Sequence, residues 1–192
     1  MRSRWREIGR GLLILFLLAG VFGCPKSKIT PQPGFGAGTD SGGMGPGAGG
    51  RGALSGLDDA RWRELGINSE AEKREFLQQA ENFENADVYY DYDAYTLSEP
   101  AKKILDDKIR FLKRYAAVKV TVEGHCDERG TNEYNLALGE RRANSALQYI
   151  GNAGLNQAKL GSVSYGEERP LATGHDEASW ARNRRAHFVL NY

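Results

Sequence analysis

Residues 124–131 read Gly-His-Cys-Asp-Glu-Arg-Gly-Thr and concentrate groups that could bind a charged ligand. Asp127 lies in this segment, and Arg142 lies on the helix expected after it. A carboxylate accepts hydrogen bonds from an ammonium group, whereas a planar guanidinium donates two parallel bonds to a carboxylate. The pair therefore predicts recognition of a zwitterion at a strand-to-helix corner. The alternative is that Asp127 pairs with Arg142, Arg129 or Arg141 and only holds the loop.

Thiol or metal catalysis would use other residues of the same region. His125 and Cys126 are adjacent, and neighbouring residues of a strand point to opposite faces, which disfavours a nucleophilic Cys–His pair. A zinc site would need three or four protein ligands. The spacing of the candidate ligands matches no common zinc motif; these candidates are His125, Cys126, His175, Asp176 and His187. We expect no catalytic residue and no metal.

Composition excludes another class of function. The 192 residues include 26 lysines and arginines against 25 acidic residues, which gives a formal net charge of +1. This balance lacks the strong positive footprint that binding to a phosphate backbone requires. We therefore expect no nucleic-acid partner.

Alternating strands and helices must position the charged groups. The capping-box spacing of Ser69 and Glu72 predicts a helix over 70–83, within a helical extension at 57–85. Ser98 and Pro100 predict the start of a second helix, whose apolar stripe continues to Leu112. A third helix is expected from 132 or 133 to 150, and strands are expected at 88–93, 118–124, 161–165 and 186–191. This order predicts an α/β fold, with helices on one or both faces of a sheet.

The first 23 residues are typical of a lipoprotein signal peptide. Four arginines precede the apolar run 12–21, which has the length of a signal core and is too short to span a membrane. Residues 21–24 then resemble a bacterial lipoprotein processing box. We expect Cys24 to carry the covalent lipid, with no other cofactor, and Pro25 after it favours the outer membrane.

The segment 24–56 is expected to be a flexible tether. Nearly half of the 24 glycines lie between residues 25 and 56, together with four prolines and few large apolar side chains. Such a segment cannot bury enough apolar area to offset the entropy lost on ordering. The tether would let a globular head at 86–192 move away from the membrane surface.

At these residues the chain resembles the OmpA-like peptidoglycan-binding domain family. The resemblance covers about residues 86–192, and the lipoprotein processing box and the tether agree with lipid-anchored members. It is carried by ordered sequence blocks at 88–93, 120–131, 133–135, 138–144, 164–166, 174–177 and 183–185.

The resemblance implies a two-layer α/β sandwich that binds the diaminopimelate side chain of cell-wall peptide stems without covalent chemistry. It implies that Asp127 accepts from the ligand ammonium and that Arg142 holds the ligand carboxylate. The further residues that it implies have three roles: Asp93 and Asn135 complete the rim, Tyr90, Asp91 and Leu138 shape it, and Arg184 supports it. Cys126, where many relatives carry alanine or threonine, would contact ligand only through its backbone.

The resemblance also implies partners and a location. These are peptidoglycan, a TolB-like periplasmic propeller with other Tol proteins, and the outer membrane, from which the lipid anchor holds the head facing the periplasm. The implied role is envelope integrity and constriction of the outer membrane at cell division. The alternative is a periplasmic scaffold for protein interactions in which wall binding is secondary.

Overall fold

The computed structural model describes residues 57–192. The expected signal peptide at 1–23, the lipidated Cys24 and the tether at 24–56 lie outside the described residues. These three expectations therefore stay predictions.

The described residues form a mixed four-stranded sheet with the strand order β1-β4-β2-β3. Strands β2 and β3 run parallel, whereas β4 is antiparallel to both of its neighbours. The connection between parallel strands requires a crossover, and helix α5 provides it. The strand bounds are β1 Val88–Tyr89, β2 Lys119–His125, β3 Leu160–Gly166 and β4 Arg185–Asn191.

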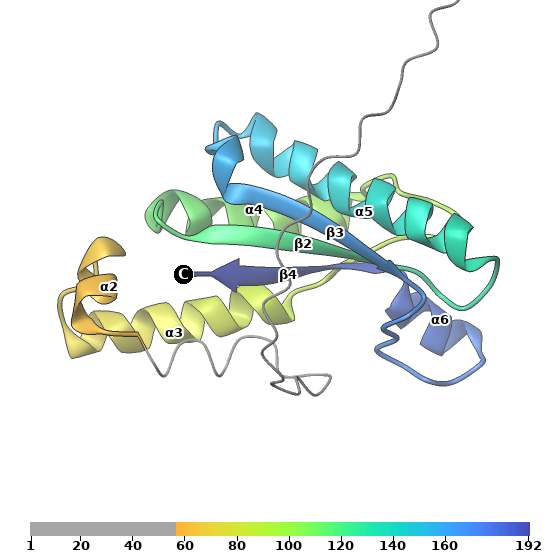
Figure 1. Ribbon diagram of the computed structural model, residues 1–192, viewed down its shortest axis with the longest axis horizontal. Helices are drawn as coiled ribbons and strands as arrows, with labels where there is room; N and C mark the ends of the chain where they lie inside the picture. The colour runs from red at the N-terminus through yellow and green to blue at the C-terminus, as the bar shows by residue number, and fades with distance from the viewer. Residues whose placement is uncertain (1–56) are drawn as a thin grey trace, which may run out of the picture. The chain divides into compact units, whose positions relative to one another are not determined.

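Helices α4 (Glu99–Arg114) and α5 (Asn132–Asn152) pack on one side of the sheet (Figure 1). The alternation of Val120 and Val122, both buried, with half-buried Thr121 and Glu123 gives β2 one apolar face for this packing. The result is the expected two-layer α/β sandwich. Within residues 57–192, none of the helices has the length and apolar character needed to cross a membrane.

Sequence signals at helix starts are confirmed by the structure. Helix α3 (Glu70–Asn85) begins with the expected capping box between Ser69 and Glu72. Helix α4 begins after Ser98, whose hydroxyl accepts from the Ala101 amide, with Pro100 in its first turn. Within the expected helical extension at 57–85, a short helix α2 (Asp59–Glu64) precedes α3. The structure adds a 3₁₀ turn at Gln157–Lys159 and helix α6 (Glu177–Asn183), neither of which was predicted.

Helix α3 lies alongside β4 (Figure 1). Strand β1 pairs with β4 at Ala186 and Arg185, so within residues 57–192 most of the outer edge of β4 has no strand partner. The Leu190 amide on this edge donates instead to the Glu84 carboxylate of α3, at 2.9 Å. The helix therefore satisfies part of a sheet edge as well as covering it.

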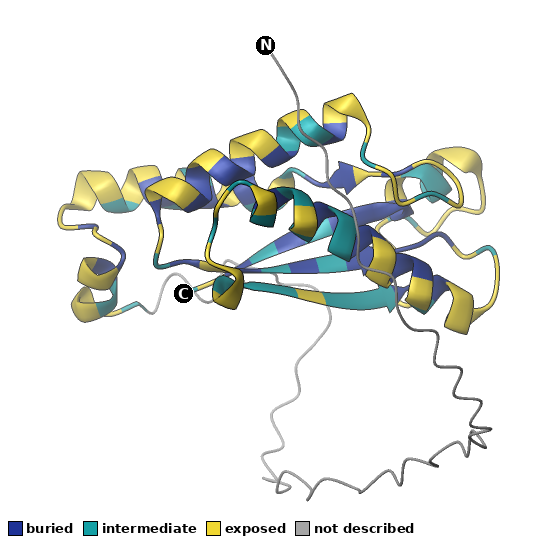
Figure 2. Cartoon of the chain, turned by 90° about the horizontal axis from the view of Figure 1, so that it is seen from above, coloured by how far each residue is buried: buried dark blue, intermediate teal, exposed yellow. Residues whose placement is uncertain are grey.

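Aromatic rings join α3, α4 and β4 into the core. Phe83 of α3 contacts Phe111 of α4 at 5.0 Å and Phe188 of β4 at 6.1 Å between ring centroids. Phe76 contacts Trp62 of α2 at 5.8 Å, which fixes the N-terminal extension to the same core. Figure 2 shows the buried positions on the strands and on the inward sides of the helices, with exposed positions outward.

A glycine pair sets how closely α5 approaches β2. A Cβ added to Gly124 would lie 1.9 Å from the Gly139 carbonyl oxygen, and one added to Gly139 would lie 2.4 Å from the Ser164 hydroxyl. Backbone therefore meets backbone at the end of β2. The N-terminal half of α5 and the loop after β2 are held together as a consequence.

The expected strand at 88–93 is wrong in its length, because β1 ends at Tyr89. Tyr90 still bonds through its amide to the Arg184 carbonyl, at 3.0 Å, but Asp93 adopts a positive φ of 52°. The chain turns here, and the carbonyls of Asp91 and Ala94 accept hydrogen bonds from Arg142. A tertiary contact with α5 thus replaces continued strand pairing.

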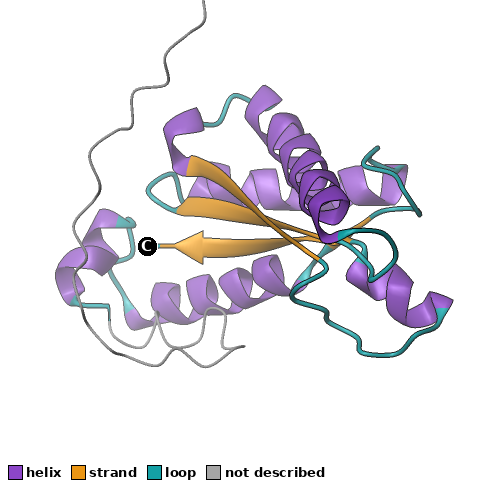
Figure 3. Cartoon of the chain, turned by 45° about the vertical axis from the view of Figure 1, so that its right-hand side comes forward, coloured by secondary structure: helices purple, strands orange, loops and turns teal. Residues whose placement is uncertain are grey.

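Loops that could carry a site gather at one end of the sheet. The loop between β2 and α5 and the loop that leads into α6 lie at the end where β2 finishes (Figure 3). The turn at residues 91–94 joins them through its bonds to Arg142. The sheet and the close α5 packing hold these three loops in place.

Candidate functional site

A cavity of about 220 Å³ lies at this end of the sheet. Its walls come from the turn after β1, the loop after β2 and the first half of α5. It brings together five of the predicted site residues, Asp93, Asp127, Asn135, Leu138 and Arg142, and Cys126, whose backbone was expected to contact ligand. The other lining residues were not predicted: Tyr92, Arg129, Gly130 and Tyr134.

Arg142 is 1% exposed, and its guanidinium is held by neutral acceptors. Its Nε donates to the Ala94 carbonyl at 2.8 Å, and Nη2 donates to the Asp91 carbonyl at 3.2 Å. Nη1 donates to the His125 carbonyl at 2.9 Å and to the Cys126 sulfur at 3.3 Å. Burial lowers the pKa of Arg142 from its ordinary value.

These contacts leave Arg142 as a buried cation without an anionic partner. Within residues 57–192, no carboxylate lies within ion-pair distance of its guanidinium, and one of its five N–H groups, on Nη2, has no acceptor there. A buried charge without a counter-ion is costly, and a ligand carboxylate in the cavity would relieve that cost.

Asp127 presents the opposite case, because its carboxylate is fully engaged. Oδ1 accepts from the Arg129 amide at 3.2 Å and from Arg129 Nε at 3.1 Å. Oδ2 accepts from Arg129 Nη2 at 2.7 Å and from Arg184 Nη1 at 3.2 Å. Burial alone would raise the pKa of Asp127, but the bonds from Arg129 and Arg184 outweigh it and lower that pKa.

The alternative pairing considered for Asp127 is therefore present in part. Asp127 pairs with Arg129, as that alternative allowed, and also with Arg184, but with neither Arg141 nor Arg142. Both Asp127 and Arg142 nevertheless line the same cavity. The Asp127 carboxylate and the Arg142 guanidinium thus line one cavity without forming an ion pair with each other.

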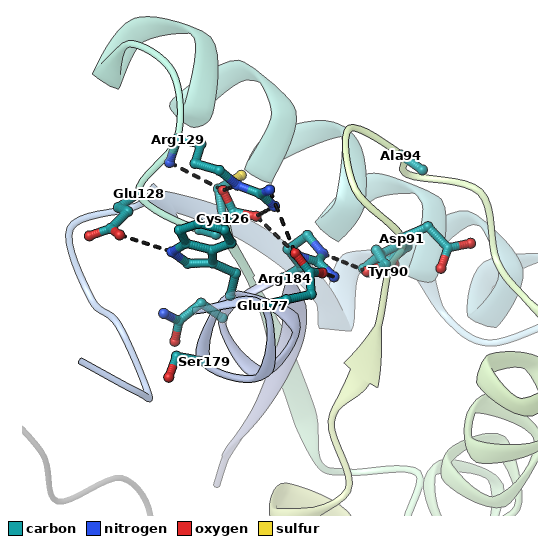
Figure 4. Close-up of polar contacts among 12 residues, drawn as sticks. Tyr90, Asp91, Ala94, Cys126, Glu128, Arg129, Glu177, Ser179 and Arg184 are labelled. Carbon is teal, nitrogen blue, oxygen red and sulfur yellow. Dashed lines mark hydrogen bonds and ion pairs between the residues drawn. The ribbon is translucent and has the colours of Figure 1, made fainter. Parts of the chain in front are cut away.

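Arg129 itself is held by aromatic rings on two elements. Its guanidinium carbon lies 4.2 Å from the Tyr92 ring centroid and 4.1 Å from that of Trp180 on α6. Glu177 of α6 pairs with Arg129 at 3.6 Å and with Arg184 at 2.7 Å. Figure 4 shows Arg129, Glu177 and Arg184 grouped beside the Asp91 turn.

Asn135 and Asp93 supply polar groups at the cavity wall. The Asn135 amide nitrogen donates to the Arg129 carbonyl at 3.2 Å and to Glu167 at 2.6 Å, which fixes the side chain. Asp93 accepts from the Tyr134 hydroxyl. Because the Asn135 nitrogen is fully used, its carbonyl oxygen is the acceptor that remains for a ligand.

Three predicted residues lie behind the cavity wall. The Tyr90 hydroxyl donates to the Arg142 carbonyl at 2.9 Å, and Asp91 contributes only its backbone carbonyl to the Arg142 guanidinium. Arg184 donates to the Tyr90 carbonyl at 3.1 Å and to Asp127 (Figure 4). Tyr90 and Asp91 thus position Arg142 instead of lining the rim, and the support expected from Arg184 goes to Asp127.

The alternative of a thiol nucleophile finds no support in the geometry. Cys126 is 3% exposed, and its sulfur lies 3.3 Å from the Asn135 carbonyl oxygen. Burial raises the pKa of Cys126 to about 11, so the thiol is protonated at neutral pH. His125 stacks on Tyr165 at 5.6 Å, and neither of its ring nitrogens has a hydrogen-bond partner among residues 57–192.

The residues considered as zinc ligands are dispersed. His175 pairs with Glu128, His187 pairs with Asp87, and the Asp176 side chain accepts from the Ser179 amide at the start of α6. In the part of the chain that the structure describes, no three histidine, cysteine or acidic side chains gather as a metal site.

Arg129 and Trp180 are two of the contributors that the sequence did not predict. Arg129 was considered only as a partner that would hold the loop, although it lies two residues after Asp127 and reaches the same carboxylate by local geometry. Trp180 belongs to a short helix that carries no long periodic pattern. The only sequence signal for that helix was Asp176, which caps it.

Comparison with known proteins relates the chain to one family. The model described as "OmpA family" matches residues 89–184. The peptidoglycan-associated lipoprotein of Haemophilus influenzae is 50% identical over 105 residues, which cover 55% of this chain and 67% of the relative. That of Pseudomonas aeruginosa is 41% identical over 179 residues, which cover 93% of this chain and 95% of the relative.

A solved structure of a protein with the same name is also similar to this chain. The crystal structure of the peptidoglycan-associated lipoprotein from Burkholderia pseudomallei is similar with a TM-score of 0.53 and 42% sequence identity. The similarity covers 55% of this chain and 89% of that chain.

Proposed function

This chain belongs to the OmpA family, and on that premise we propose that it binds peptidoglycan without covalent chemistry by recognising the diaminopimelate side chain of peptide stems. One observation carries the proposal. A buried guanidinium without a carboxylate partner in residues 57–192 and a carboxylate on the same cavity wall complement the two charges of that side chain. The relatives are named peptidoglycan-associated lipoproteins, which agrees with this ligand.

The ligand carboxylate accepts from Arg142, whose position is already fixed by four hydrogen bonds. Little side-chain entropy is then lost on binding, because the guanidinium is preorganised. The cavity of about 220 Å³ is smaller than the roughly 300 Å³ at which drug-sized pockets begin. It suits the end of one side chain, while the rest of the stem lies outside.

The ligand ammonium takes acceptor positions on Asp127, Asp93 and the Asn135 carbonyl oxygen. All four lone-pair directions of the Asp127 carboxylate are filled by Arg129 and Arg184. Ammonium binding therefore requires Arg129, the more exposed of these two arginines, to yield part of its contact. The Asp127 carboxylate thus has cationic partners both without ligand, from Arg129 and Arg184, and with ligand, from Arg184 and the ligand ammonium.

The anchor completes the mechanism. A lipid on Cys24 would hold the chain in the outer membrane, with the head facing the periplasm and the tether giving it reach to the wall. A head held near many identical stems gains avidity through its high effective concentration, so a weak single pocket is sufficient. The function is then to link the outer membrane to the cell wall.

The wider role that we propose is in the Tol–Pal system. A TolB-like propeller and other Tol proteins would be the protein partners, and the role would be envelope integrity and constriction of the outer membrane at division. The resemblance and the family relation support this part of the proposal. No catalytic step is part of it.

Co-sedimentation of the full chain with purified cell-wall sacculi tests the wall proposal. Wild type is expected to sediment with the sacculi and to be released by free meso-diaminopimelate, whereas Arg142→Lys is expected to stay in solution. Lysine keeps the charge but not the planar donor geometry, so it separates recognition from a general loss of charge. Equal sedimentation of both proteins would reject the pocket assignment.

A pull-down with the TolB-like propeller tests the scaffold alternative. Loss of the propeller together with retained wall sedimentation in Asp127→Ala would favour a protein-interaction scaffold over a wall receptor. Retained propeller binding with lost sedimentation would favour the proposed function.

A further inference from the structure

Arg141 is an exposed cation with unusual surroundings for a surface residue. Its guanidinium carbon lies 5.7 Å from the Tyr95 ring centroid and 5.9 Å from the Tyr134 ring centroid. Both tyrosines are themselves large exposed side chains, at 49% and 46% exposure. The two rings limit the directions that the arginine can take, so the side chain is partly ordered before any ligand arrives.

No carboxylate neutralises Arg141 within the described part of the chain. Arg129 offers the contrast, since it is also flanked by two rings but pairs with Asp127 at 2.7 Å and with Glu177 at 3.6 Å. Among the described residues, Arg141 has only the ring contacts. Its donors therefore remain available to an external acceptor, whereas those of Arg129 are used.

Arg141 stands beside the mouth of the cavity. Tyr134, which flanks it, lines the cavity and donates to Asp93 of the turn after β1, which lines the cavity too. Arg141 follows Tyr134 by seven residues on α5, so both lie on the same side of that helix. Arg142, the next residue, turns inward to the cavity, and the two guanidiniums thus serve the outside and the inside of one opening.

We propose that Arg141 forms a second carboxylate subsite at the cavity mouth, which binds the α-carboxylate of the glutamyl residue next to diaminopimelate in the peptide stem. This inference rests on the proposed function. The stem enters the cavity by the end of one side chain, and its remaining residues cross the rim where Arg141 lies. A guanidinium binds a carboxylate through two parallel bonds and a carboxamide less well, so Arg141 distinguishes a glutamyl stem from an amidated one.

Calorimetric titration of the full chain in detergent with two synthetic stems tests the proposal. One probe is the tripeptide L-Ala-γ-D-Glu-meso-diaminopimelate, and the other is the same tripeptide with the glutamyl α-carboxylate converted to a carboxamide. Wild type is expected to bind the carboxylate form about three- to tenfold more tightly, and the ratio should decrease as salt screens the exposed charge.

The variant Arg141→Gln should bring the ratio of the two affinities close to one while leaving the affinity for the carboxamide form unchanged. Arg110→Gln, an exposed arginine on α4 that pairs with Asp107, is the matched control and should keep the wild-type ratio. The inference would be overturned if Arg141→Gln kept the wild-type ratio of the two affinities. It would also be overturned if the variant lost affinity equally for the carboxylate and the carboxamide form.

The design separates the two proposals. If wild type binds neither tripeptide, the proposed function fails and the inference fails with it. If wild type binds both forms equally, and Arg142→Lys abolishes that binding, the proposed function stands and only the Arg141 subsite is rejected.

Discussion

Two buried cations in this molecule face different neighbours. Lys108 is 2% exposed between α3 and β4, where its ammonium donates to the Phe83 carbonyl and lies 4.2 Å and 4.1 Å from the rings of Phe83 and Phe188. Arg142 is 1% exposed, but its guanidinium has four hydrogen bonds and reaches the wall of the cavity.

The difference shows what a buried charge is used for in each region. Lys108 caps the C-terminal end of α3, and burial lowers its pKa to about 7, so the charge is opposed by its surroundings. Arg142 can stay charged, because three carbonyl oxygens from two segments, the turn at residues 91–94 and the end of β2, replace its water shell. The first arrangement stabilises a helix end, and the second prepares a receptor.

The largest expected effect is on ligand affinity, which should depend on Arg142 and not on Lys108. Arg142→Gln should weaken binding of the stem tripeptide by about 100-fold, because one charge-assisted contact contributes roughly 1.5 to 3 kcal/mol and the adjacent carbonyls lose their donor. Lys108→Gln, the corresponding change in the other region, should leave tripeptide affinity within about twofold. Calorimetry measures the tripeptide affinity of both variants. Equal weakening in the two would show that Arg142 has no special role in binding compared with Lys108.

Next in size is a change that moves only the Arg142 region. Gly124→Ala places a methyl group 1.9 Å from the Gly139 carbonyl, so α5 must shift, and we expect the free energy of unfolding to decrease by about 2.5 kcal/mol. Gly161→Ala is the control, because its nearest neighbour would be 3.8 Å away. Denaturant titration should show the control within about 1 kcal/mol of wild type.

The third test follows the pKa of Lys108. Its folded-state pKa is about 7, below the unfolded value of roughly 10.4, so the unfolded chain binds more protons between these values and stability rises with pH there. From pH 7 to pH 9 wild type should gain about 2 kcal/mol relative to Lys108→Met. Parallel pH profiles of unfolding free energy in the two proteins would show that Lys108 is not perturbed.

The smallest effect concerns Arg129. Its charge is already balanced by Asp127 and Glu177, so Arg129→Gln should change tripeptide affinity by no more than about fivefold. The same calorimetric series reports it. A loss as large as that of Arg142→Gln would mean that Arg129, and not Arg142, is the main anion receptor.

Local patterns were sufficient to predict most of the framework. The capping box at Ser69, the cap at Ser98 and the alternation of Val118, Val120 and Val122 each reflect interactions between residues close in sequence. Such interactions are visible in a single chain segment. They place Asp127 after a strand and Arg142 on the following helix, which is why the two were predicted to share a corner.

Contacts between segments that are distant in sequence could not be predicted from such local patterns. The pattern of Tyr89 to Asp93 is typical of a strand, and only the arrival of Arg142 at the carbonyls of Asp91 and Ala94 explains why pairing stops. Arg184 reaches Asp127 across an equally long interval of sequence. Lys108 interrupts the apolar stripe of α4, and its burial depends on the end of α3, which no local pattern specifies.

Helix α3 has one more consequence, which concerns the behaviour of the protein among many copies of itself. A bare outer edge on β4 would offer unpaired amides and carbonyls to any passing strand, which is a common route to fibrils. By placing Glu84 on the Leu190 amide, the helix keeps this edge occupied. A head domain trimmed of residues 57–85 would expose that template, so self-association is the hazard that the N-terminal extension prevents.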